Sequence, residues 1–174
     1  MKRARESSID IHVHELSDML RLWGEATAAK GVPPHVTLLY PWRTPPVNAD
    51  DIAALRAAIA RIRAFAIRFV GIEHFTARAL YLKIADQSPI RALMQAIHAA
   101  FPDSPPYRGE FLDPIPHLTV AKASTEAELD RVQQELSFTL GPHLPLSIDV
   151  RFVVVMEEDA EGAWHSAVEL PLAL

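Results

Sequence analysis

Apolar and polar residues alternate along several short stretches of the chain, the pattern of β-strands with one buried face. On this pattern strands are predicted at residues 8–14, 35–41, 65–70, 79–84, 117–122, 146–156 and 164–170. Between them apolar residues recur at helical spacing, which predicts helices at residues 15–30, 48–62, 89–101 and 125–138. The chain is therefore predicted to contain both strands and helices.

Turn and cap residues set several boundaries of these elements. Asn48 or Asp50 is a predicted N-cap, and Thr125 with Glu128 forms a predicted capping box. Residues 102–116 contain five prolines and one glycine, which predicts a packed crossing between two lobes rather than a helix or strand.

One tetrapeptide pattern occurs twice. Residues 35–38 read His-Val-Thr-Leu and residues 117–120 read His-Leu-Thr-Val, each directly after a proline. Residues two apart in a strand share a face, so each copy points an imidazole and a hydroxyl to one side and two apolar groups to the other. Either copy alone is ordinary strand sequence. The pair is what predicts a site.

The two copies stand at equivalent points of the chain. Their separation is 117 − 35 = 82 residues, about half the length, and a helix and further strands follow each copy. We therefore predict a single domain, residues 1–174, with a bilobal, duplicated α+β fold. The lobes are related by a pseudo-two-fold axis, which would bring the two motif strands together across a cleft. The lobe halves are predicted as roughly residues 1–101 and 102–174, and the prediction allows strands to be exchanged between them.

Two imidazoles and two hydroxyls suit phosphodiester cleavage. One imidazole near neutral pH can remove a proton from the nucleophile while the other protonates the leaving oxygen. Hydroxyl groups can donate to the phosphoryl oxygens. His35 and His117 are thus the predicted catalytic pair, with Thr37 and Thr119 as phosphate ligands. This scheme requires no metal and no cofactor.

The motifs resemble those of the two-histidine (2H) phosphoesterase superfamily. Residues 31–41, Gly-Val-Pro-Pro-His-Val-Thr-Leu-Leu-Tyr-Pro, and residues 105–107 with 116–120 resemble its bacterial 2′-5′ RNA ligase-like branch. The resemblance runs from about residue 31 to the end. It implies a bilobal α+β fold in which two antiparallel sheets line a central, water-filled cleft and helices lie outside. It also implies metal-independent action on 2′,3′-cyclic phosphates, 2′-5′ linkages or related cyclic phosphodiesters. It also implies that His35 is the acid for a 2′ leaving oxygen and His117 the base.

Other residues are candidates for contacts with a substrate. Arg43 and Arg108 are predicted to neutralise phosphate, and Tyr81 and Trp164 to stack on a base. The alternative for each is an ordinary surface charge or a packed ring.

His12 and His14 share a predicted strand face with Asp10. That spacing suits a metal ion, a place in the cleft wall, or a solvated strand face.

Composition narrows the class of protein. The 174 residues are 49% hydrophobic and include no cysteine, which excludes a disulfide scaffold. The 17 basic and 22 acidic side chains give a net charge of −5, which argues against binding long duplex nucleic acid. No apolar run has the length of a membrane helix, and no apolar core follows the basic start. We expect a cytoplasmic monomer that handles an RNA end or a small cyclic nucleotide.

Three hypotheses for function follow. The first is metal-independent hydrolysis, or reversible ligation, of a cyclic phosphodiester or 2′-5′ linkage in RNA ends or small nucleotides. The alternative is a non-catalytic module that binds the phosphate of an RNA end or nucleotide on the same fold. The third is a metal hydrolase built on His12 and His14, for which the sequence offers no convincing third ligand.

Overall fold

The computed structural model describes residues 4–20, 31–76, 78–111 and 113–174, and in these residues the strands form two four-stranded antiparallel sheets. The first sheet has the order β2-β1-β7-β8, with β1 at Ser7–His12, β2 at His35–Leu39, β7 at Phe152–Glu158 and β8 at Trp164–Pro171. The second has the order β5-β4-β3-β6, with β3 at Phe65–His74, β4 at Ala79–Ile84, β5 at His117–Lys122 and β6 at Leu146–Val150.

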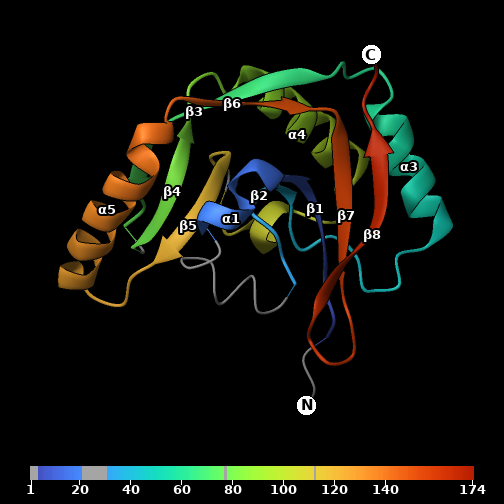
Figure 1. Cartoon of the computed structure of the whole chain (residues 1–174). Helices are drawn as coiled ribbons and strands as arrows, with labels where there is room; N and C mark the ends of the chain where they lie inside the picture. The colour runs from blue at the N-terminus through green and yellow to red at the C-terminus, as the bar shows by residue number, and fades with distance from the viewer. Residues whose placement is uncertain (1–3, 21–30, 77, 112) are drawn as a thin grey trace.

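The two sheets have matching layouts. Each begins with a motif strand at its edge, β2 or β5, and the motif strand pairs with the strand that precedes it in the chain, β1 or β4. Each sheet also takes strands from both sides of residue 101. β3 and β4 pair with the later β5 and β6, and β7 and β8 join the early β1. The predicted α+β, duplicated architecture is confirmed (Figure 1).

Helices cover the outside of the sheets. The longer ones are α3 at Ala49–Ile59, α4 at Ser88–Ala100 and α5 at Glu126–Leu140, and α3 and α5 lie at opposite flanks of the molecule (Figure 1). Short helical turns occur at η1 (His14–Leu16), α1 (Ser17–Leu20), η2 (Pro106–Gly109) and η3 (Gly141–His143). The helix predicted at 15–30 is therefore seen only at its start, because residues 21–30 lie outside the described part of the chain.

The predicted caps are present. The Asn48 side chain accepts from the backbone N–H of Asp51, and Thr125 accepts from that of Glu128. The Glu128 carboxylate in turn accepts from the N–H of Ser124, one residue earlier than a standard capping box uses. No helix among the described residues is both long and apolar enough to cross a membrane.

The single strand predicted at 146–156 is wrong, because two strands lie there. β6 ends at Val150, Arg151 is outside any strand, and β7 begins at Phe152. β6 pairs with β3 in the second sheet while β7 pairs with β1 in the first. Because no single straight strand can belong to both sheets, the chain breaks its pairing where it passes between them.

The core holds the motif strands by their apolar residues. Val36 and Leu118 have no exposed surface, and Leu38 and Val120 are 1% and 2% exposed. Burial alternates along both strands, so His35 and His117 point away from this core. The His98 ring of α4 supports the edge strand β2 by a 2.8 Å hydrogen bond from Nε2 to the Leu38 carbonyl.

Candidate active site

The two motif strands meet. β2 and β5 belong to different sheets, yet they contact each other along the line where the sheets approach. His35 and His117 are close enough that a positive charge on His35 lowers the pKa of His117. The 82-residue repeat in the sequence thus becomes one site in space, with an imidazole from each lobe.

Both imidazoles are fixed in the same way. His35 Nδ1 lies 2.8 Å from the Pro33 carbonyl oxygen, and His117 Nδ1 lies 2.6 Å from the Ile115 carbonyl oxygen. A carbonyl can only accept, so the proton of each neutral ring is on Nδ1 and the Nε2 lone pair is available. In each copy the accepting carbonyl is two residues before the histidine, and a proline between them holds the backbone extended.

Aromatic rings surround the second imidazole. The Phe75 ring meets the His117 ring edge to face at 4.8 Å between centroids, and Tyr81 lies at 5.5 Å. Phe75 and Tyr81 stack on each other at 4.3 Å, and the Tyr81 hydroxyl donates to Glu73 at 2.9 Å. Tyr81 also pairs across the sheet with Thr119. The structure therefore brings Tyr81 to the motif, but as a support for the histidine ring.

This apolar setting favours a neutral imidazole at His117. Burial lowers its pKa, the hydrogen bond to the Ile115 carbonyl opposes that change, and the charge of His35 adds to it. A histidine that is neutral near pH 7 suits the role of a general base.

Polar groups surround the first motif instead. The register of β1 and β2 places Asp10 opposite Thr37 and His12 opposite His35. Asp10 is 1% exposed and accepts a hydrogen bond from the Ser8 hydroxyl. Burial raises the pKa of Asp10, while the charge of His35 and the hydroxyls of Ser8 and Thr37 oppose the change. The first motif thus has a buried carboxyl group as its neighbour, whereas the second motif has aromatic rings.

The proline-rich crossing contributes Tyr107. Tyr107 and Arg108 both adopt left-handed backbone, with φ of 49° and 56°, an uncommon pair for residues with side chains. The Tyr107 N–H donates to the Tyr40 carbonyl at 2.6 Å. The Tyr107 hydroxyl lies close enough to Thr37 and Asp10 to interact with both, and burial raises its pKa. The strained turn therefore places a phenol beside the first motif.

The remaining predicted substrate contacts have protein partners. Arg43 binds Asp51 at 3.1 Å, Asp103 at 2.9 Å and the Ser104 hydroxyl at 2.7 Å. These contacts tie the loop after β2 to α3 and to the turn that follows α4. Arg108 forms an ion pair with Glu6.

Trp164 begins β8, and its ring is 6.3 Å from that of Tyr40, which is 6.4 Å from that of Tyr107. The three rings are thus successive neighbours, and Tyr107 lies beside the first motif.

Three neighbours of the motifs were not predicted as site residues. Asp10 alternates with the apolar Ile9 and Ile11, so the sequence pattern does indicate that its side chain lies on the same strand face as that of His12. Tyr107 and Phe75 come from irregular segments, where strand periodicity says nothing about direction. Among the described residues, no group of three or more His, Cys, Asp or Glu side chains is arranged to hold a metal ion.

Comparisons with known proteins agree with this geometry. The sequence model of the 2′-5′ RNA ligase superfamily matches residues 6–162. A comparison with curated proteins gives no match.

Solved structures share the fold. E. coli LigT complexed with 3′-AMP has a TM-score of 0.62 at 14% identity, over 99% of this chain and 100% of that one. The apo form of E. coli LigT has a TM-score of 0.64 at 13% identity, over the same shares of the two chains. The protein TT0787 of Thermus thermophilus has a TM-score of 0.62 at 18% identity, over 96% and 97%. At these identities the likeness concerns the fold, and it is the match over residues 6–162 that shows the chain to belong to the 2′-5′ RNA ligase, or 2H phosphoesterase, superfamily.

Proposed function

We propose that the protein hydrolyses a cyclic phosphodiester, such as a 2′,3′-cyclic phosphate at an RNA end or on a small nucleotide, or a 2′-5′ linkage. The observation that carries this proposal is the pair of motif strands. His35 and His117 come together from two sheets, and each is held by Nδ1 on a carbonyl so that Nε2 is available. Thr37 and Thr119 stand one strand pleat away on the same faces.

The two sides of the site divide the proton transfers. His117 removes a proton from water as its oxygen attacks phosphorus, and the apolar surroundings that lower its pKa favour the neutral ring this step needs. His35 donates a proton to the departing ribose oxygen. Its nearest polar neighbours come from β1: His12 pairs with His35, and the buried Asp10 pairs with Thr37 on the same face.

The hydroxyls complete the site. Thr37 and Thr119 donate to the non-bridging phosphoryl oxygens, where negative charge builds up in the transition state. The ring opens to a phosphomonoester and a free hydroxyl, and the proton taken up by His117 is balanced by the proton released by His35. Each lobe thus contributes one histidine and one threonine.

The expected substrate is small. A net charge of −5 disfavours a long polyanion. The structurally similar E. coli LigT has been crystallised with 3′-AMP and with ATP, which supports a nucleotide-sized ligand for this fold.

A product assay tests the proposal. Nucleoside 2′,3′-cyclic phosphates and 2′-5′ and 3′-5′ dinucleotides are incubated with the wild type and with the His35→Ala and His117→Ala variants. We expect turnover by the wild type, with or without a strong chelator, and a loss of about 10²- to 10⁴-fold in each variant. His143→Ala, which removes an exposed histidine of η3, is the matched control.

The outcomes separate the hypotheses. Full activity in either motif variant would show that the imidazoles are not the acid and base. Tight nucleotide binding without turnover would favour the non-catalytic phosphate-binding module. Loss of activity on chelation would favour a metal hydrolase instead.

A further inference from the structure

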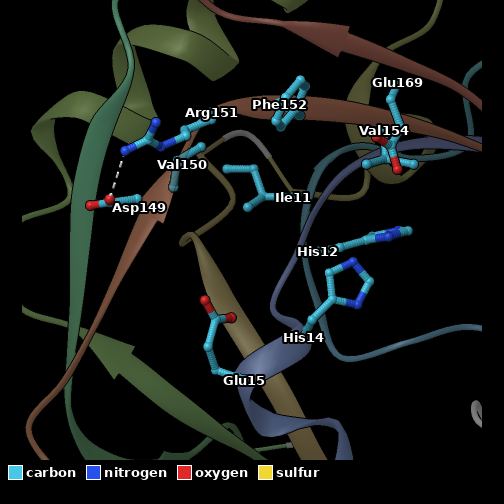
Figure 2. A pocket seen from close by; sticks show the side chains of 10 residues that line it. All are labelled: Ile11, His12, His14, Glu15, Asp149, Val150, Arg151, Phe152, Val154 and Glu169. Carbon is cyan, nitrogen blue, oxygen red and sulfur yellow. Dashed lines mark hydrogen bonds and ion pairs between the residues drawn. The ribbon is translucent and has the colours of Figure 1, made fainter.

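A pocket of about 300 Å³ lies beside the first motif and has no role in the chemistry above. It is formed where the chain crosses from β6 to β7, together with the end of β1, the turn that follows it and β8 (Figure 2). Its lining consists of Ile11, His12, His14, Glu15, Asp149, Val150, Arg151, Phe152, Val154 and Glu169.

Part of the pocket lining belongs to the face of the first sheet that carries the motif. Residues paired across antiparallel strands share a face. His12 pairs with His35, Asp10 pairs with Val154, and Val154 pairs with Glu169. The face that carries His35 therefore continues through His12 to Val154 and Glu169. Adjacent side chains on such a face are about 5 Å apart, so a ligand held at His35 is one strand away from the pocket.

His12 gives the pocket a polar wall. Its Nε2 is buried and has no hydrogen-bond partner among the described residues. The ring meets that of His14 edge to face at 5.6 Å. Burial, with smaller effects of His35 and His14, lowers the pKa of His12 to about 4, so the ring is neutral at pH 7 and offers one donor and one acceptor. A buried polar atom without a partner is costly unless something else supplies the bond.

Phe152 gives the pocket an aromatic surface. It is 47% exposed although it begins a strand whose next residues are buried. Phe152 stands two residues before Val154, which pairs with Asp10, so its side chain lies on the face of the sheet that carries Asp10 and His12. Exposed aromatic rings in sheets that bind nucleic acid act as stacking platforms.

The charge of the lining argues against a second phosphate site. Glu15, Asp149 and Glu169 supply three carboxylates, against the one guanidinium of Arg151, which lies 3.3 Å from Asp149. Carboxylates accept hydrogen bonds and repel anions. The lining therefore suits a flat, uncharged group with amino donors.

We propose that this pocket is the subsite for the base of the substrate nucleotide. The base stacks on Phe152, hydrogen-bonds to His12 Nε2, and directs an exocyclic amino group at the acidic rim, while its phosphate lies between His35 and His117. The inference rests on the proposed function, and it adds a preference for cytosine or adenine over uracil.

The test compares substrates with and without a base. The value of kcat/KM is measured for cytidine 2′,3′-cyclic phosphate, uridine 2′,3′-cyclic phosphate and base-free 1-O-methylribose 2′,3′-cyclic phosphate. The proteins are the wild type, Phe152→Ala, Phe152→Leu and Phe152→Trp. Phe138→Ala, which removes an 86% exposed phenylalanine from α5, is the matched control.

We expect the ratio of kcat/KM for the cytidine substrate to that for the base-free substrate to fall about 5- to 100-fold in Phe152→Ala and Phe152→Leu. Phe152→Trp should retain the ratio, as should the control. The wild type should prefer cytidine to uridine.

A ratio unchanged in Phe152→Ala would overturn the stacking subsite, and equal values for cytidine and uridine would overturn the amino preference. If the wild type turns over none of the three substrates, the proposed function itself fails. That result is distinct from turnover with an unchanged ratio.

Discussion

The buried histidine opposite the first motif makes a prediction about stability that can be worked through in full. The pKa of His12 is lowered to about 4 from an ordinary value of 6.5. Between these two pH values the unfolded chain binds a proton that the folded chain does not. Folding stability must therefore fall as the pH drops from about 6.5 to about 4. The change in proton affinity corresponds to about 3 kcal/mol, and because the ring is only partly buried we expect about 2 kcal/mol of this in practice.

Replacing the group isolates its effect. His12→Gln removes the titrating ring and keeps a polar side chain, so the variant should lose about 2 kcal/mol less stability than the wild type between pH 7 and pH 4. Urea unfolding followed by circular dichroism, at intervals of half a pH unit, gives the two curves. His143→Gln, which removes an exposed histidine, should follow the wild type. Identical pH dependence in the wild type and His12→Gln would refute the reasoning.

Three further substitutions test the framework of the site by urea unfolding. Leu118→Ala removes a side chain with no exposed surface from the motif strand β5 and should lower the free energy of unfolding by about 2–5 kcal/mol. Thr119→Ala, on the exposed face of the same strand, should lower it by less than about 1 kcal/mol. Equal losses of stability in the two variants would contradict the assigned faces. Gly31 has φ of +84°, and an added Cβ would lie 2.4 Å from the Trp164 carbonyl oxygen, so Gly31→Ala should destabilise by more than about 1 kcal/mol. A neutral Gly31→Ala would show that the backbone before the first motif moves freely.

Local patterns predicted the strands and caps well, for a clear reason. Alternation of polar and apolar residues reports which face of a strand is buried, and Asn48 and Thr125 act on backbone groups three residues away. The same logic failed at Arg151. Residues 146–156 read as one apolar strand, and only the competing partners β3 and β1 divide it in two.

The site residues also differ in whether local sequence patterns could predict them. His35 and His117 were recognisable because each stands in a repeated Pro-His-apolar-Thr-apolar pattern. Arg43 was proposed from its position near a motif, but its carboxylate partners lie 8 and 60 residues further along the chain. Tyr107 could not be predicted, because a left-handed turn sets its direction.

The sequence by itself determined what each motif strand presents, since two-residue alternation fixes an imidazole and a hydroxyl on one face of β2 and β5. It also determined that there are two such strands. Only the tertiary structure decided which residues surround the motifs. Asp10 and His12 lie beside the first motif, and Phe75 and Tyr81 lie beside the second. Those neighbours come from pairing and loop packing between segments far apart in the chain. A repeat therefore shows that the site has two halves, and the fold makes the halves electrostatically different.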